Sequence, residues 1–229
     1  MTKPSAKVIP ISGKKPAKIR QKKAGKSTPI YQIKATLCGT DPPVWRKLLI
    51  SGDTNLGLLH GILQISMGWQ NCHLHQFIVG RTCYADPAAE LDDAKNEFNT
   101  LISDIAPAEK DTFMYVYDFG DSWEHVIQVE KILTEHKDFT LPAVCIDGER
   151  ACPPEDCGSI PGYYDLCKIM QDQDHERYDE MLEWLGDEYD PEQFDAGVVN
   201  KYLVKIKLKK PNWQQLGKIL AERDGAEFE

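Results

Sequence analysis

The stretch that decides the fold of this chain is Tyr117-Asp118-Phe119-Gly120-Asp121-Ser122-Trp123-Glu124-His125. On both sides of it, large side chains recur at every second position, over residues 113–117 and 123–129. A period of two is typical of strands, and a Gly/Asp tip between two such runs is typical of a hairpin turn. The sequence therefore predicts a β-hairpin whose tip gathers acidic side chains and an imidazole beside aromatic rings.

Outward from this hairpin, the chain predicts an α+β fold. The same alternation predicts strands over 31–37 and 44–50, joined by a proline-rich turn, and another strand over 73–79. Residues 55–67 carry an apolar stripe behind an N-cap at Asp53 or Thr54, which predicts a helix. We expect a mostly antiparallel sheet, built from the 31–50 and 113–132 hairpins and residues 73–84, to pack on this helix.

The second half of the chain predicts helices after an irregular region. Residues 141–161 hold so many prolines and glycines that we expect no regular element there. Helices are expected over about 163–170, 175–185, 195–205 and 212–223, and this helical segment is expected to cover the sheet. Residues 85–100, rich in Asp and Asn, are expected to form a surface loop. The predicted domain limits are a disordered basic tail over 1–28, an α+β domain over 29–208, and a C-terminal helix and tail over 209–229.

Charge is distributed unevenly along the chain. Residues 1–28 hold nine Lys and Arg and no acid, whereas the rest holds 18 basic and 36 acidic residues. An acidic body repels a phosphate backbone, so any contact with nucleic acid is assigned to the tail. Its candidate residues are Lys14, Lys15, Lys18, Arg20, Lys22 and Lys23. A purely solubilising tail is the alternative.

Deletion of residues 1–28 is expected to abolish any salt-sensitive binding to DNA, because that affinity arises from counterions released by the basic side chains. Titration of labelled DNA at several salt concentrations, with the full chain and the truncated chain, measures this. Binding that survives the deletion would place the nucleic-acid contact on the body instead.

Cysteine usage and hydropathy indicate the compartment. Seven cysteines are an odd number, and the N-terminus lacks the apolar core of a secretory signal. No apolar run approaches the length that crosses a bilayer. We therefore expect a cytoplasmic protein, without membrane contact, whose thiols are reduced or bound to metal rather than paired in disulfides.

Several phrases, taken together and in order, resemble a known family. They are VWRK at 44–47, MGW at 67–69, HLHQF at 73–77, YDFGDSWEH at 117–125, GERACPPEDCG at 148–158 and YDPEQFD at 189–195. This combination is similar to the plasmid pRiA4b ORF-3-like family, sometimes described as a passenger protein of insertion elements. The resemblance covers about residues 31–205 and implies a prokaryotic α+β domain, often near mobile elements and without an established activity. Ser159 departs from the pattern, where a second glycine is expected.

The hairpin and its surroundings supply a candidate binding cleft. Its residues are His75, Asp118, Asp121, Trp123, Glu124, His125 and Arg150. Carboxylates close to one another raise some pKa values, and a nearby histidine can exchange protons near neutral pH. The alternative is that Asp118 and Asp121 accept backbone N–H groups of the turn and that Arg150 pairs with an acid of its own loop, or with Asp118 or Asp121. The tripeptide at 118–120 matches the DFG of kinases, but no HRD phrase or glycine-rich loop accompanies it, which excludes that class.

Two sets of residues could hold zinc. His73 and His75 lie at alternate positions of one expected strand, so both imidazoles can reach one ion. Cys145, Cys152 and Cys157 lie in a proline-stiffened loop that a metal could hold together, with Cys167 or a histidine as fourth ligand. Their spacing lacks the C-x2-C knuckle that makes zinc motifs specific, and buried reduced thiols are the alternative.

The sequence is therefore compatible with three functional hypotheses. The first is an accessory or binding module of mobile-element type with an unidentified protein or nucleic-acid partner, and it is favoured because no catalytic spacing stands out. The second is a structural zinc protein that uses the cysteine loop. The third is a metal-dependent hydrolase that uses the histidine and carboxylate cluster. Whether the chain is an enzyme is left open by the sequence.

Overall fold

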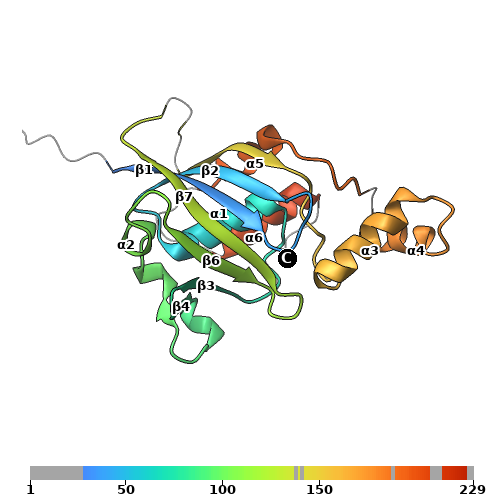
Figure 1. Ribbon diagram of the computed structural model, residues 1–229, viewed down its shortest axis with the longest axis horizontal. Helices are drawn as coiled ribbons and strands as arrows, with labels where there is room; N and C mark the ends of the chain where they lie inside the picture. Colours follow the sequence, from blue (N-terminus) through green and yellow to red (C-terminus); the bar gives the residue numbers. More distant parts are fainter. Residues whose placement is uncertain (1–27, 137–138, 140–141, 187–188, 207–212, 226–229) are drawn as a thin grey trace, which may run out of the picture.

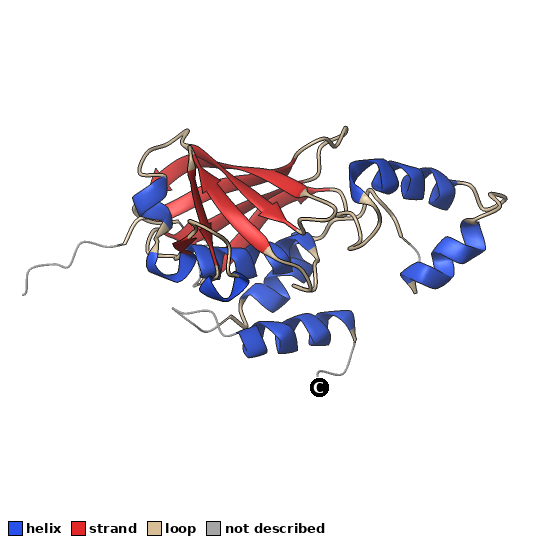
Figure 2. Cartoon of the chain, turned by 90° about the horizontal axis from the view of Figure 1, so that it is seen from below, coloured by secondary structure: helices blue, strands red, loops and turns tan. Residues whose placement is uncertain are grey.

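The computed structural model describes residues 28–136, 139, 142–186, 189–206 and 213–225. The basic tail, with its candidate nucleic-acid residues, lies outside the described residues. The described chain forms one eight-stranded sheet, with helices on one side of it and a helical lobe at one end (Figure 1; Figure 2). None of its helices has the length and apolar content that a membrane span requires.

The sheet is antiparallel except at one edge, and its order is β5-β4-β3-β6-β7-β1-β2-β8. Its strands are β1 (Ile30–Leu37), β2 (Trp45–Ser51), β3 (His75–Val79), β4 (Thr82–Ala85), β5 (Lys95–Asn96), β6 (Thr112–Tyr117), β7 (Trp123–Leu133) and β8 (Ala143–Glu149). The expected hairpin is confirmed: β6 and β7 pair antiparallel, and Tyr117 faces Trp123 at the turn. The expected α+β class and the strands around 31–50 are confirmed as well.

Helix α1 (Leu56–Met67) forms the core with the inner face of the sheet. All its residues are buried, and its first turn is closed by Asn55, whose side chain accepts from the Leu58 N–H at 2.8 Å. Short elements follow in the acidic region expected to be a loop: the 3₁₀ turns η1 (Pro87–Ala89) and η2 (Glu97–Asn99) flank β5, and α2 (Ile102–Ile105) comes next. Most of this region is therefore a connection, but η2 packs against α1 and brings an acidic side chain into the core.

The expectation that residues 141–161 lack regular structure is wrong. Strand β8 pairs with β2 at the sheet edge, and Pro142 stands just before it while Pro153 stands after it. The prolines flank the strand instead of interrupting it, and an edge strand tolerates a missing N–H more easily than a central one. On the outer side of β8, Asn200 accepts the Cys145 N–H and donates to the Cys145 carbonyl, both at 2.8 Å.

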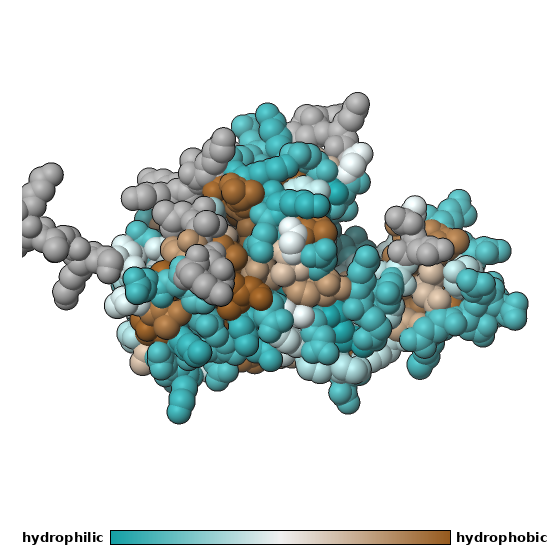
Figure 3. All heavy atoms as spheres, turned by 90° about the horizontal axis from the view of Figure 1, so that it is seen from above, coloured by the Kyte–Doolittle hydropathy of each residue, from teal (hydrophilic) through white to brown (hydrophobic). Residues whose placement is uncertain are grey.

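The helices after β8 divide into two groups. Helices α3 (Ser159–Gln171) and α4 (Tyr178–Leu185) pack on each other and project from the end of the sheet, so the expectation that the whole helical segment covers the sheet is wrong for them (Figure 1). Helices α5 (Ala196–Leu203) and α6 (Trp213–Asp224) return to the body, where α5 packs on β8 and α1. The surface seen in Figure 3 is mainly hydrophilic, with smaller hydrophobic patches on the body and on the α3–α4 lobe.

Candidate functional site

Imidazole side chains lie in the layer between α1 and the sheet. His60 on α1 and His125 on β7 have no exposed surface, and His75 on β3 is 7% exposed. Their rings surround Tyr115, at centroid distances of 5.9, 5.5 and 6.1 Å for His60, His125 and His75. His75 and His125 thus lie on the same side of the sheet, as the cleft hypothesis requires, but they lie in the core rather than at an open rim.

His60 belongs to a closed circuit of hydrogen bonds. The Asn71 N–H donates to Gln64 Oε1 at 2.8 Å, and Gln64 Nε2 donates to the Tyr115 hydroxyl at 3.0 Å. That hydroxyl donates to His60 Nδ1 at 2.8 Å, and His60 Nε2–H donates to Asn71 Oδ1 at 2.6 Å. Because the amide oxygen can only accept, the circuit assigns the proton of the neutral imidazole to Nε2. Burial agrees, since it holds the pKa of His60 well below its usual value.

His75 connects this circuit to a buried acid. Its ring stacks on that of His60 with centroids 3.4 Å apart and planes 3° apart, and its Nε2 lies 2.9 Å from Glu97 Oε2. Glu97 has no exposed surface, and burial, helped by the charge of Asp86, raises its pKa to about 8. Burial lowers the pKa of His75 to about 4. At neutral pH the pair is therefore a carboxylic acid beside a neutral imidazole, which avoids a charge within the imidazole stack.

A cavity of about 350 Å³ opens beside this stack. It is lined by Asn71, Cys72, His73, Leu74, His75, Asp86, Ala88, Ala89 and Trp213, and we call it the Trp213 cavity. The Trp213 ring meets the rings of His60 and His75 edge-on, at 5.4 and 6.5 Å, and its Nε1 donates to Asp86 Oδ2 at 2.8 Å. The first residue of α6 is thereby tied to η1 across the cavity wall.

The hairpin tip carries a second polar cluster. His73 Nε2 lies 3.2 Å from Asp156 Oδ1 and 3.7 Å from Asp118 Oδ2. The other oxygen of Asp118 accepts the Gly120 N–H at 2.8 Å, which is the turn role expected as the alternative. Asp121 accepts the Gly158 N–H at 3.1 Å, so the tip is held against the 152–158 loop.

Aromatic side chains join the hairpin to the same loop. Trp123 is fully buried and its carbonyl accepts from His125 Nδ1–H at 3.0 Å, while burial lowers the pKa of His125 to about 4. Trp69 meets the His125 ring edge-on at 5.2 Å and donates from Nε1 to the Pro153 carbonyl at 3.0 Å. Glu124, on the opposite face of β7, is exposed. Trp123 and His125 therefore anchor the hairpin, and Glu124 points away from the cleft.

In the part of the chain that the structure describes, the cysteine thiols do not lie close enough together to bind one metal ion. There, only His73, Asp118 and Asp156 bring three possible ligand atoms within 4.8 Å of one another. All seven cysteines are free. Burial raises the pKa of Cys152 and Cys157 to about 12 and that of Cys145 to about 11, as for small buried thiols, while the charge of Arg46 opposes the shift at Cys145 and Cys152. His75 is also separate from the His73 cluster, since it pairs with Glu97.

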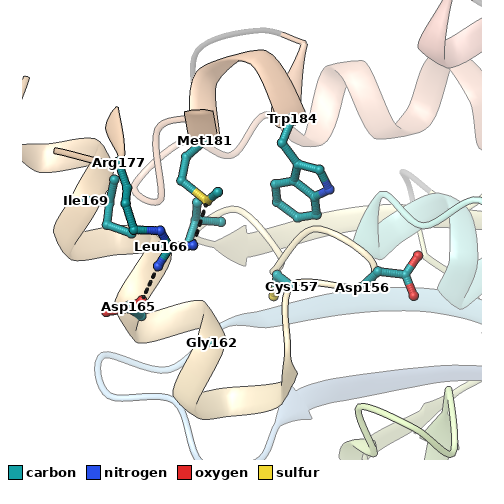
Figure 4. A pocket seen from close by; sticks show the side chains of 9 residues that line it. All are labelled: Asp156, Cys157, Gly162, Asp165, Leu166, Ile169, Arg177, Met181 and Trp184. Carbon is teal, nitrogen blue, oxygen red and sulfur yellow. Dashed lines mark hydrogen bonds and ion pairs between the residues drawn. The ribbon is translucent and has the colours of Figure 1, made fainter. Parts of the chain in front are cut away.

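The 152–158 loop also borders a smaller cavity, of about 190 Å³, beside the α3–α4 lobe. Figure 4 shows Arg177 directed toward Asp165 and Met181, with Trp184 on α4 above Cys157 and Asp156. Arg177 Nη1 lies 3.2 Å from Asp165. Arg150 does not line this cavity, and its guanidinium forms an ion pair with Glu192. The acid that pairs with Arg150 thus comes from another loop than expected.

The structure adds residues that the sequence did not single out for a site: Glu97, Asp86, Asp156 and Trp213. Glu97 and Asp86 sit in an Asp/Asn-rich stretch that resembles a solvated loop. A signal for Glu97 existed in Phe98 beside it, because a large apolar residue in an acidic loop indicates packing against the body. Asp156 is 83 positions from His73, so no local pattern could join them.

Comparison with known proteins gives the family. Residues 29–198 match the family described as plasmid pRiA4b ORF-3-like protein. The chain belongs to this family. The match covers the sheet, α1 and the helices as far as the first turn of α5, and it confirms the resemblance drawn from the motifs.

Two known proteins are similar to this member of the pRiA4b ORF-3-like family, one in sequence and one in sequence and fold. The uncharacterized protein y4hQ of Sinorhizobium fredii (strain NBRC 101917 / NGR234) is 34% identical over 181 residues, covering 75% of this chain and 89% of that protein. The crystal structure of MM3350 from Methanosarcina mazei Go1, a protein of unknown function, superposes with a TM-score of 0.66 at 31% identity. That match covers 74% of this chain and 97% of MM3350. Function has to be argued from the site itself.

Proposed function

We propose that this protein is a binding module whose ligand site is the Trp213 cavity, and that the group bound there is a small organic cation, an ammonium or a guanidinium. The cation can belong to a free amine or to a Lys or Arg side chain of a protein partner. The accessory role near mobile elements that the family resemblance implies is part of this proposal, since such a role requires binding and no chemistry.

The charge of the cavity supports a cation. Asp86 is the carboxylate of its lining, and no Lys or Arg is among the described side chains that line it. Asp86 accepts from two neutral donors, the Ala88 N–H and Trp213 Nε1, both at 2.8 Å, so its charge is not neutralised by them. The same charge contributes to raising the pKa of Glu97. A negative potential in a partly enclosed space attracts cations and repels phosphates and carboxylates.

The walls suit a cation as well. An indole face attracts an ammonium or guanidinium that lies within about 6 Å of it, because the ring quadrupole is negative above the plane. Trp213 supplies an indole in the cavity lining, with its N–H edge directed at Asp86. His75 is neutral at neutral pH, so its imidazole does not repel a cation.

The observation that carries the proposal is the place of the buried Glu97–His75 pair. Burying an acid and an imidazole costs free energy, and apolar side chains would fill the same core without that cost. The pair lies directly behind the cavity wall, since His75 itself lines the cavity. Shifted ionisable groups beside a cavity are typical of functional sites.

Thermal unfolding of the full chain tests the proposal. Choline, agmatine and a capped arginine peptide are compared with acetate and phosphate at equal ionic strength. We expect the cations to raise the melting temperature and the anions to leave it unchanged. The increase in melting temperature caused by choline and agmatine is then compared with the increase caused by the peptide. A larger effect of the small cations indicates a metabolite site, and a larger effect of the peptide indicates a site for a protein side chain. Stabilisation by the anions alone would contradict the proposal.

Asp86→Asn is the matching variant, because asparagine has nearly the same shape and removes the charge; it keeps one acceptor oxygen, whereas Asp86 accepts from Ala88 and from Trp213 on two different oxygens. Affinity for the cation is expected to fall at least about tenfold, which corresponds to about 1.4 kcal/mol. Asp92→Asn, an exposed acid outside the cavity lining, serves as control and is expected to bind like the wild type. Equal losses in both variants would indicate attraction to the acidic surface in general.

A further inference from the structure

Three side chains from three separate segments converge at the hairpin tip. His73 precedes β3, Asp118 begins the turn after β6, and Asp156 lies in the loop after β8. One possible ligand atom from each side chain lies within 4.8 Å of those of the other two. Ligands bound at about 2.1 Å to one ion are roughly 3 to 4 Å apart. The His73–Asp156 and His73–Asp118 distances of 3.2 and 3.7 Å already lie in that range.

His73 Nε2 is the atom that points to a missing partner. It is shielded from solvent and makes no hydrogen bond with the described residues, and its polar neighbours are the two carboxylates. A shielded ring nitrogen is normally satisfied by a donor, an acceptor or a metal. An ion between the carboxylates would satisfy it without a change of backbone.

Asp118 is positioned as a ligand would be. Its side chain is 9% exposed, and Oδ1 is held by the Gly120 N–H, which leaves Oδ2 directed at His73. Its own N–H donates to the Leu74 carbonyl at 2.9 Å, so the position of the carboxylate is fixed relative to His73 by the neighbouring residue. No Lys or Arg of the described chain pairs with Asp118 or Asp156, so two negative charges meet here with an imidazole alone.

We infer that His73, Asp118 and Asp156 form a binding site for a divalent transition-metal ion. One imidazole and two carboxylates favour Mn²⁺, Fe²⁺ or Zn²⁺ over Mg²⁺ and Ca²⁺, which prefer oxygen ligands alone. Asp156 is the open side of the site, with 71% of its side chain exposed, so coordination positions are left for water or for a ligand. His73 also lines the Trp213 cavity and Asp156 lines the cavity of Figure 4, so the ion would lie between the two.

Calorimetric titration of chelator-treated full-length protein with Mn²⁺ tests the site. Mn²⁺ is chosen because thiols bind this hard ion weakly, so the seven cysteines do not obscure the result. We expect one Mn²⁺ per chain. Asp156→Asn and His73→Gln are each expected to weaken binding by at least the roughly 10- to 100-fold that the loss of a supporting partner alone causes. Asp92→Asn is expected to bind like the wild type.

X-ray absorption spectroscopy at the zinc edge then identifies the atoms bound to the metal. Nitrogen and oxygen neighbours around a single bound Zn²⁺ are expected, and sulfur neighbours would assign the metal to the cysteine loop and overturn the inference. Absence of Mn²⁺ binding at millimolar concentration, or equal affinity in all three variants, would overturn it too. Asp156 is exposed, so its variant is expected to fold normally, and an unchanged melting temperature checks this. The result is independent of the Asp86 test, because Asp86 is not in this cluster.

Discussion

Replacing Glu97 with glutamine is expected to abolish most of the loss of stability that the wild-type protein shows between about pH 6.5 and pH 8. In the folded protein the pKa of Glu97 is about 8, and its ordinary value is 4.5. Between these two values the folded state holds a proton that the unfolded chain has released. The contribution of Glu97 to the free energy of unfolding therefore falls as pH rises through this window, by an amount on the order of 4 kcal/mol for a fully buried carboxyl.

The neighbouring histidines act in the opposite direction and at lower pH. The pKa values of His75 and His125 are lowered by burial from 6.5 to about 4, so their contribution is present above pH 6.5 and is lost as pH falls through 4. The wild-type protein should therefore be most stable at about pH 6.5. Glutamine has the size of Glu97, can donate to His75 Nε2 and cannot ionise. The free energy of unfolding of the Glu97→Gln variant should therefore stay constant between pH 6.5 and 8.

Urea unfolding followed by tryptophan fluorescence at pH 5, 6, 7, 8 and 9 measures both curves. Glu124→Gln, an exposed position on the outer face of β7, is the control and should follow the wild type at every pH. Parallel curves for wild type and Glu97→Gln from pH 5 to 8 would show that Glu97 is already ionised in the folded protein. The paired acid and imidazole behind the Trp213 cavity would then carry charge, and the cavity would be more acidic than described.

Gly162→Ala is expected to destabilise the protein by at least about 2 kcal/mol, because it forces a methyl group into an occupied space. A Cβ at this position would lie 1.9 Å from the Cys157 carbonyl oxygen and 2.8 Å from its carbon. These are backbone atoms of the tight turn that enters α3, where the Gly162 N–H donates to the Gly158 carbonyl at 3.0 Å. The 152–158 loop would have to move, and Asp156 would move with it.

Gly61→Ala is the matched control for this variant. Both glycines lie inside helices, where alanine is intrinsically favoured by up to about 1 kcal/mol. A Cβ at Gly61 would meet Leu216 at 3.6 Å, which is an ordinary contact. Thermal and urea unfolding should show Gly61→Ala unchanged or more stable, and Gly162→Ala less stable. Equal stability of the two variants would mean that the turn before α3 relaxes easily and does not fix the position of Asp156.

The sequence predicts this fold where local pattern and tertiary packing agree. The 117–125 hairpin, the 31–50 strands and α1 each bury one face, so their periodicity is visible in the chain itself. Strand β8 was missed because Pro142 and Gly148 suggest an irregular region, although its edge position tolerates both. The projection of α3 and α4 could not be predicted either, because an amphipathic helix does not specify which surface it packs on.

The candidate sites were predictable only in part. His73, His75, Asp118 and His125 could be named because they lie in or beside the hairpin and β3. Their partners could not, since Glu97 and Asp156 reach them from segments that are far away in sequence and rich in other acids. Nothing local distinguishes a buried acid from a solvated one. The difference comes from Gly57, where the absence of a side chain lets η2 approach α1.

Asn200 has a consequence for how copies of the protein behave at high concentration. Its side-chain amide occupies the outward backbone groups of Cys145 in β8, which an incoming strand would otherwise use. At the opposite margin of the sheet, β5 has only two residues. Asn200 therefore interrupts the outer edge of β8 at Cys145, and the short β5 offers little backbone for strand addition, which is a common route to aggregation. Asn200, a polar side chain on α5, thus hinders the addition of a further strand along β8.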